Sequence, residues 1–184
     1  MTTPSDPIEI ITEDEVNKAQ RAWCDGLIEI CQEYENRGDY RGKAEKFLAR
    51  LYDFDGSRVF FRPTLAMAPQ NFRTTLEGAL AYFIGEDDDF PNDDGFIKKG
   101  WIAADFDNEI EGQDAIQVHA NIGIAMGNVF LRKAEMTVGG KETVVDKLFV
   151  FMKRKGLVRL IVHNSALSNI PDTEVPEDPD KPKY

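Results

Sequence analysis

Two polar side chains near the end of the chain, two residues apart, are the first candidates for chemistry. His163 and Ser165 lie in the stretch 157–168, whose branched apolar residues are typical of a β-strand. Side chains alternate between the two faces of a strand, so His163 and Ser165 share one face with Ile161. Asn164 points the other way. Two residues along a strand span about 6.6 Å, so one small polar ligand can touch both side chains.

Further polar side chains that can line the same pocket come from earlier in the chain: Thr64, Tyr82, Arg73, Thr75 and Trp101. Each also has a purely structural interpretation. Thr64 can cap a turn, and Tyr82 can be a core tyrosine with a satisfied hydroxyl. Arg73 and Thr75 can lie on the surface of a helix, and Trp101 can belong to the core.

The histidine and cysteine content excludes several kinds of site. The chain has two histidines, His163 and His119, so it cannot build a three-histidine zinc site on its own. Cys24 and Cys31 lie on one helical stripe about 10 Å apart, too far for a disulfide, and we interpret them as buried thiols. A serine hydrolase is disfavoured, because the chain has no Gly-x-Ser-x-Gly elbow. We expect no metal and no cofactor.

The charge of the chain limits its partners. The formal net charge is −11, and binding to a phosphate backbone requires a basic surface, so nucleic acid is excluded as a partner. An anionic substrate must be held by local donors against this average field. The acidic stretch 86–94 lacks the central glycine and the final glutamate of a calcium-binding loop, which predicts a solvated acidic loop.

The first residues show neither the basic nor the apolar region of a signal peptide, and no apolar run is long enough to span a membrane. We therefore expect a cytoplasmic protein without a membrane partner.

The element pattern predicts one domain with helices first and strands second. Apolar spacing and capping signals indicate helices over 13–34, 40–52 and about 71–84. A short strand is expected at 58–62, followed by longer strands at about 100–109, 114–121, 122–134, 141–153 and 157–166. The domain is expected to cover 12–170, between a flexible arm at 1–11 and a flexible tail at 171–184.

This order predicts an α+β fold in which N-terminal helices pack on one face of a curved antiparallel β-sheet. A bent sheet wrapped around a helix leaves a conical pocket, and the last strand presents alternate side chains to it. The plan is that of the nuclear-transport-factor-2-like (NTF2-like, or cystatin-like) cone.

Several short motifs resemble those of the iota-class carbonic anhydrase family, in the family's order and over roughly residues 12–170. The first two blocks lie around the short strand and the third helix, and the others lie in the strands. They are Phe61-Arg62-Pro63-Thr64, Phe72-Arg73-Thr74-Thr75, Ala79-Leu80-Ala81-Tyr82-Phe83-Ile84-Gly85, Gly95-Phe96 with Trp101, Ala125-Met126-Gly127-Asn128-Val129-Phe130 and His163-Asn164-Ser165-Ala166.

The resemblance implies an NTF2-like homodimer that interconverts CO2 and bicarbonate. The family includes both metal-dependent and metal-free members, and in the metal-free members a threonine, a tyrosine and a serine hold the substrate. By motif position the catalytic residues are Thr64, Tyr82, His163 and Ser165. The substrate-binding residues are Arg73, Thr75 and Trp101. The chain departs from the family where a second histidine and a second serine are replaced by Asn164 and Ala166. Strand alternation directs both replacements away from the pocket.

One mechanism and two alternatives follow. Hydroxyl groups position a water molecule, a neutral His163 with an ordinary pKa near 6.5 takes its proton, and the hydroxyls stabilise the developing charge. The first alternative is a cone that binds a small ligand without chemistry. The second is another lyase or isomerase that uses His163 as its base.

Overall fold

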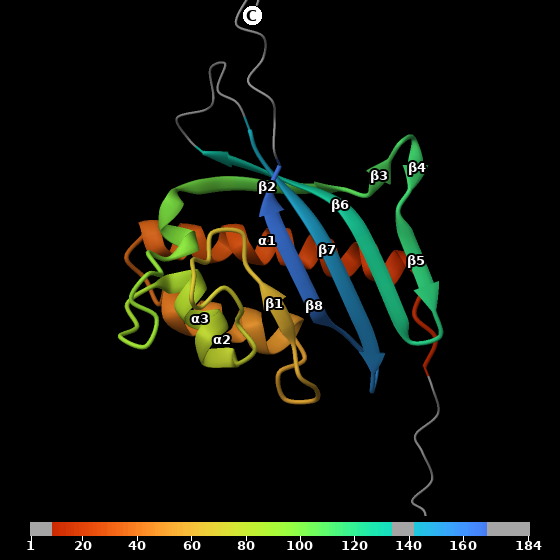
Figure 1. Ribbon diagram of the computed structural model, residues 1–184, viewed down its shortest axis with the longest axis horizontal. Coiled ribbons are helices and arrows are strands. Elements are labelled where there is room, and N and C mark those ends of the chain that lie inside the picture. The colour runs from red at the N-terminus through yellow and green to blue at the C-terminus, as the bar shows by residue number, and fades with distance from the viewer. Residues whose placement is uncertain (1–8, 134–141, 169–184) are drawn as a thin grey trace, which may run out of the picture.

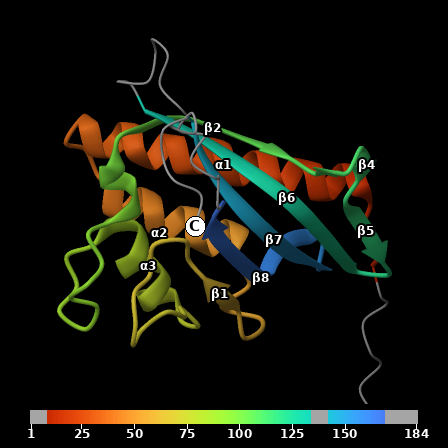
Figure 2. The ribbon, with the colours of Figure 1, turned by 45° about the horizontal axis from the view of Figure 1, so that its top comes forward.

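The computed structural model describes residues 9–133 and 142–168, and it confirms the α+β fold with helices on one side of a curved sheet (Figures 1 and 2). The sheet is built mainly from three long strands. The elements are α1 (Glu13–Glu35), α2 (Tyr40–Leu51), β1 (Phe60–Arg62), α3 (Leu76–Ile84), a 3-10 turn η1 (Phe96–Lys99), β2 (Trp101–Asp107), β3 (Glu109–Ile110), β4 (Gln113–Asp114), β5 (Ile116–His119), β6 (Ile122–Lys133), β7 (Thr143–Arg154) and β8 (Leu157–Leu167).

The long helix α1 supplies one wall of the core. It begins at the predicted capping box, in which the Thr12 side chain accepts from the Glu15 amide and the Glu15 carboxylate accepts from the Thr12 amide. Apolar residues at helical spacing bury one stripe of the helix, which includes Trp23 and Leu27. Cys24 and Cys31 are buried free thiols on this stripe, as predicted, and burial raises the pKa of both to about 12.

The sheet is mixed, whereas the sequence predicted an antiparallel one. Its order is β1-β8-β7-β6-β2, with β5 also paired to β6. The difference lies at β1, which pairs parallel to β8 and places Phe61 beside His163 and Arg62 beside Asn164. A strand as short as β1 carries too little pattern to reveal its partner. This pairing brings the segment after β1 next to the end of β8.

The long strand β6 changes partner at a glycine. Residues 128–133 of β6 pair with β2, and residues 122–125 of β6 pair with β5. Gly127 lies between them with φ +146°, and a Cβ atom there would collide with the Asp107 carbonyl oxygen. Gly127 therefore lets the chain leave the sheet edge for the β3–β4 hairpin and return to it (Figure 1).

A β-bulge in β8 changes which residues face inward. Val162 pairs with Val150 and Leu160 with Phe151, so Ile161 is the extra residue. Leu160 is buried in its place, and the prediction that Ile161 shares the face of His163 is wrong. Beyond the bulge the alternation holds: His163 and Ser165 are buried, and Asn164 is exposed.

Two boundaries also differ from the prediction. The helix expected from about residue 71 begins at Leu76, because the Thr75 side chain caps it and the Arg73 amide donates to the Phe61 carbonyl as an extension of β1. Residues 9–11, expected in a loose arm, pack on the domain: Ile11 is buried and its amide donates to the Ala120 carbonyl. The rest of that arm and the tail 171–184 lie outside the described residues.

Among the helices that the structure describes, none has both the length and the apolar character needed to span a membrane.

Replacing Gly127 by alanine tests the close approach of Asp107. We expect Gly127→Ala to lower the free energy of unfolding by about 2 kcal/mol or more, since it adds a collision to an unfavourable φ. Gly156→Ala is the matched control: Gly156 has φ +75° with no atom within 4 Å of the added carbon, so only the backbone cost of about 1 kcal/mol remains. Urea unfolding measures both, and equal losses would contradict the collision.

Candidate functional site

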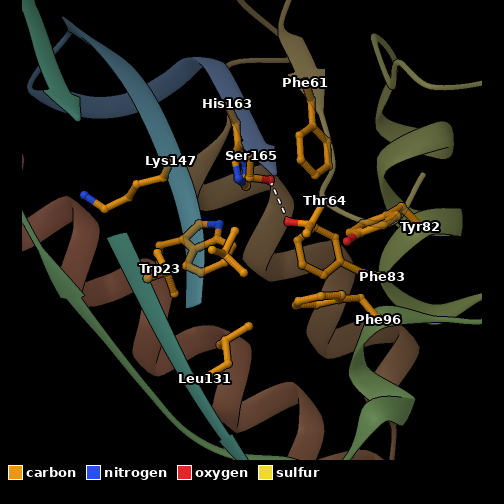
Figure 3. Close-up of a pocket in the computed structure, with 12 residues that line it drawn as sticks. Trp23, Phe61, Thr64, Tyr82, Phe83, Phe96, Leu131, Lys147, His163 and Ser165 are labelled. Carbon is orange, nitrogen blue, oxygen red and sulfur yellow. Dashed lines mark hydrogen bonds between the residues drawn. The ribbon is translucent and has the colours of Figure 1, made fainter. Parts of the chain in front are cut away.

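A small cavity lies between the sheet and the helices, and its volume is about 20 Å3 (Figure 3). An enclosed water needs about 10–15 Å3, so the cavity has room for a molecule of that size. Most of its wall is aromatic or aliphatic, with a polar group at the end nearest β8. The lining residues are Trp23, Phe61, Thr64, Tyr82, Phe83, Phe96, Val129, Leu131, Val145, Lys147, His163 and Ser165.

All four residues predicted to be catalytic line this cavity. Thr64 donates from Oγ1 to Ser165 Oγ at 2.9 Å (Figure 3). Arg62 holds the pair in register, because its guanidinium donates to the Ser165 carbonyl oxygen at 2.8 Å. The parallel β1–β8 pair thus joins two hydroxyls from residues about a hundred positions apart.

Tyr82 completes the polar group from α3, and its hydroxyl lies on the Thr64 side of the ring (Figure 3). Burial raises the pKa of this hydroxyl well above its usual value, although Leu65 and Thr64 oppose the shift through hydrogen bonding. The phenol is therefore neutral at ordinary pH and can donate a hydrogen bond.

His163 is enclosed by aromatic rings. Phe61 stacks on the imidazole at 4.5 Å between ring centroids, and Phe149 meets it edge-on at 4.6 Å. Burial, aided by the positive charge of Lys147, lowers the pKa of His163 to about 3. The ring is therefore neutral at physiological pH and much less basic than the ordinary histidine assumed from the sequence.

Two residues that the sequence did not single out form a hydrogen-bonded chain that ends at His163 Nδ1. The hydroxyl of Tyr52 lies 2.8 Å from His163 Nδ1, and Trp23 Nε1 donates to the same hydroxyl at 2.9 Å. Both residues belong to apolar helical patterns, so nothing in their spacing distinguished them from ordinary core positions.

Lys147 is a third residue that the sequence did not single out. Its aliphatic stem reaches the cavity wall, and its ammonium points away from Ser165 (Figure 3). The ammonium donates to Gln20 Oε1 and Asn108 Oδ1, both at 2.6 Å. Burial lowers the pKa of Lys147 to about 8. Alternation along β7 would have placed it inward, but a lysine at such a position is usually on the surface.

The three residues predicted to bind substrate do not line the cavity. Arg73 is buried in an ion pair with Asp93, at 2.7 Å. Thr75 caps α3 by accepting from the Gly78 amide, and Trp101 Nε1 donates to the Phe96 carbonyl. Their side-chain polar groups are used to hold the fold, so these predicted roles are not reflected in the geometry.

The Arg73–Asp93 ion pair shows that the acidic loop 86–94 is partly buried. The sequence predicted that 86–94 is solvated, but the Asp93 side chain is 3% exposed. Arg73 also lies over the Phe90 ring, 4.7 Å from its centroid. Part of this loop is thus fixed against the segment that precedes α3 rather than free in solvent.

A second cavity, of about 230 Å3, adjoins the first on the side of this loop. Tyr82 and Phe96 line both cavities and stack at 5.4 Å between centroids. Leu65, Asp94 and Lys99 are among the other residues around the outer cavity. The Tyr82–Phe96 pair is therefore the partition between them.

The inner cavity presents three hydroxyls and one imidazole to whatever it encloses. No carboxylate is among the described residues that line it. Across the described ranges, no three His, Cys, Asp or Glu side chains gather as a possible metal-binding group. His119 lies exposed on β5, and Asn164 and Ala166 face the opposite side of the sheet. Such a donor set suits a small, planar, oxygen-rich anion.

Comparison with known proteins agrees with this chemistry. The family model described as metal-independent carbonic anhydrase matches residues 14–167. A protein of Nostoc sp. (strain PCC 7120 / SAG 25.82 / UTEX 2576) named metal-independent carbonic anhydrase is 41% identical over 160 residues, which cover 85% of this chain and 74% of that protein.

Solved structures extend the comparison. The crystal structure of the iota-carbonic anhydrase from a cyanobacterium, complexed with bicarbonate, matches with a TM-score of 0.80 and 37% identity, over 93% of this chain and all of that one. An NTF2-like protein with a cystatin-like fold from Novosphingobium aromaticivorans matches with a TM-score of 0.50 and 12% identity, over 86% of this chain and 83% of that one. The second likeness shows the fold alone, and it confirms the predicted NTF2-like plan.

The lowered pKa of His163 predicts a pH-dependent stability. Between about pH 6.5 and 3 the unfolded chain binds a proton at this residue and the folded chain does not, so stability falls as the pH falls, by up to about 1.4 kcal/mol per pH unit. Above pH 6.5 His163 is neutral in both the folded and the unfolded chain, so this residue does not lower the stability there. We expect the free energy of unfolding in urea to fall less steeply for His163→Gln than for the wild type between pH 6.5 and 4.5. The other titrating groups contribute equally to the pH dependence of both proteins. Parallel curves would contradict a buried neutral imidazole.

Proposed function

This chain belongs to the metal-independent carbonic anhydrase family, and we propose that it interconverts CO2 and bicarbonate in the inner cavity lined by Thr64, Tyr82, His163 and Ser165. The observation that carries the proposal is the 2.9 Å hydrogen bond between Thr64 and Ser165, which places two hydroxyls together in an otherwise apolar enclosure. The bicarbonate complex of the cyanobacterial relative supports this choice of substrate.

The cavity binds the substrate through local donors. Bicarbonate is a small planar anion, and the chain carries a net charge of −11, so the average field of the protein opposes its entry. Hydroxyl donors inside a low-dielectric enclosure offset this field, since hydrogen bonds to a charged oxygen are stronger there than in water. The aromatic walls around them suit CO2, which carries no net charge.

Hydration requires a water molecule to attack the carbon of CO2. In the proposed step the water oxygen forms the new bond, an electron pair of one C=O bond moves to its oxygen, and the water loses a proton. The donors of Thr64, Tyr82 and Ser165 stabilise the charge that develops on the carboxylate oxygens, as an oxyanion hole does, and for this the Thr64 hydroxyl rotates from Ser165 Oγ to the substrate. Because hydroxyls both accept and donate, the Thr64–Ser165 pair can also orient the attacking water and pass on its proton.

The outer cavity is the proposed route for exchange with solvent. Tyr82 and Phe96 separate it from the inner cavity, so movement of either ring joins the two and adds the space that CO2 and a water molecule need beyond the closed inner cavity of about 20 Å3. The proton released by hydration leaves on this side, toward the exposed carboxylate of Asp94 and solvent.

The expected homodimer is proposed to form through the sheet face opposite the helices. That face exposes Met126 at 47%, and the hollow around it, of about 410 Å3, is lined by the apolar Ile110, Leu148 and Ala166 and by the polar Asn128, Asp146 and Asn164. Exposed apolar side chains with a polar surround are a common site for association. The surface lies on the other side of the sheet from the cavity, so a partner would leave the donors in place.

Removing single hydroxyls tests the catalytic proposal. We expect Thr64→Val, Tyr82→Phe and Ser165→Ala each to slow CO2 hydration about a hundred-fold, the effect of losing one donor to a developing oxyanion. Stopped-flow measurement of the pH change gives the rates. Ser168→Ala, which removes a hydroxyl bound to Asp146 just beyond β8, is the control and should retain the wild-type rate.

The same variants separate catalysis from simple binding. If the wild-type protein is stabilised by bicarbonate but does not accelerate hydration, the cavity is a binding site without chemistry. If all three cavity variants hydrate CO2 at the wild-type rate, the proposed site is wrong.

Placing a charge on the apolar sheet face tests the dimer. We expect Met126→Lys to shift the sedimentation mass from a dimer toward the 20.8 kDa monomer, because the charge would be desolvated in the interface. Leu157→Lys is the control, since Leu157 is 54% exposed at the β7–β8 turn. A wild-type protein that sediments as a monomer would contradict the proposal.

A further inference from the structure

A continuous hydrogen-bonded chain runs from α1 to the cavity through a fully buried tyrosine. Trp23 Nε1 donates to Tyr52 Oη at 2.9 Å, and Tyr52 Oη lies 2.8 Å from His163 Nδ1. Tyr52 is 0% exposed and directly follows α2. Residues of α1, of the end of α2 and of β8 are thus linked at Nδ1 of the imidazole.

The donors and acceptors of this chain determine where the protons lie. An indole nitrogen only donates, so Tyr52 Oη accepts from Trp23. The hydroxyl proton of Tyr52 then needs an acceptor, and His163 Nδ1 is the partner that the described residues provide. If Nδ1 carried a proton, that hydroxyl proton would have no partner in a site closed to water, which is a costly arrangement. Nδ1 is therefore the acceptor.

A neutral imidazole carries one proton, so an accepting Nδ1 places that proton on Nε2. Phe61 covers a face of the ring, and Phe149 and Trp23 meet it in edge-on contacts. Nε2 has no hydrogen-bond partner among the residues that the structure describes, and His163 lines the cavity. The edge of the ring that carries Nε2 is the part left to meet an enclosed molecule.

We propose that Tyr52 and Trp23 are positioning residues that hold His163 as an Nε2–H donor to an oxygen of the bound bicarbonate. This inference rests on the proposed function for its substrate. It assigns His163 the role of a fourth donor beside Thr64, Tyr82 and Ser165, and it excludes the role of general base that the sequence suggested. A protonated Nε2 has no lone pair with which to take a proton from water.

The tautomer has a consequence for the proton path. Since His163 cannot accept the proton of the attacking water in this state, the proton leaves through the hydroxyls of Ser165 and Thr64. The imidazole keeps its own proton throughout the reaction. Its contribution is electrostatic and directional, and it depends on Tyr52 to fix which nitrogen faces the cavity.

Nitrogen-15 NMR of the imidazole rings tests the assignment directly. The chain has two histidines, so the ring spectrum contains two patterns, and His119→Gln identifies that of His163. We expect the wild-type protein to show a protonated Nε2 and an unprotonated Nδ1 at neutral pH. Adding bicarbonate should shift the Nε2–H proton resonance downfield as the hydrogen bond forms.

Tyr52→Phe removes the hydroxyl that selects the tautomer. We expect its His163 pattern to become a mixture of the two tautomers and its CO2 hydration to slow about ten-fold, the order of one hydrogen bond. Tyr40→Phe is the matched control, because it removes a hydroxyl bonded to Glu86 away from the cavity. It should leave both the His163 pattern and the rate unchanged.

The outcomes separate this inference from the function on which it rests. A wild-type spectrum with the proton on Nδ1 overturns the inference even if the protein hydrates CO2, and it needs no variant that might fail to fold. A Tyr52→Phe protein that keeps a pure Nε2–H pattern and the full rate also overturns it. A wild-type protein that shows the Nε2–H tautomer without hydrating CO2 refutes the proposed function but leaves Tyr52 as the residue that sets the tautomer.

Discussion

Polar groups that are buried in an aromatic core must be hydrogen-bonded, and the rest of this structure depends on that requirement. An unpartnered polar group in such a place costs about 1–3 kcal/mol. His163, Ser165 and Lys147 are all at most 4% exposed, and each makes at least one side-chain hydrogen bond. The partners come from distant elements: Tyr52 after α2, Thr64 after β1 and Gln20 on α1. The fold is thus tied together at the cavity, and the orientations of the polar groups are set before a substrate enters.

The parallel pairing of β1 with β8 brings the hydrogen-bonding partners of the site together. It sets Arg62 beside Asn164, so that Arg62 reaches the Ser165 carbonyl and Thr64 reaches the Ser165 hydroxyl. The ion pair of Arg73 with Asp93 fixes the segment between β1 and α3 against the acidic loop, next to the outer cavity. Substrate chemistry and structural support therefore use different polar residues of the same short segment.

The sequence predicted the α+β layers, the main helices and the inward direction of His163 and Ser165, because helical spacing and strand alternation are local properties. It did not predict the parallel partner of β1, which depends on a three-residue strand, or the extra residue Ile161, which no local pattern marks. Motif resemblance selected Thr64 and Tyr82 correctly as cavity residues. It did not indicate the buried ion pair of Arg73, whose partner Asp93 lies twenty residues away, and it did not reveal Tyr52, which resembles any other core aromatic.

The most direct test of the central claim is stopped-flow CO2 hydration by protein that has been stripped of metal with a chelator and assayed for residual zinc, iron and manganese. The account predicts that acceleration over buffer is unchanged by stripping and is not increased when Zn2+ or Mn2+ is returned, because the donors of Thr64, Tyr82, His163 and Ser165 carry the reaction. Loss of activity on stripping, with recovery on adding metal, would contradict it.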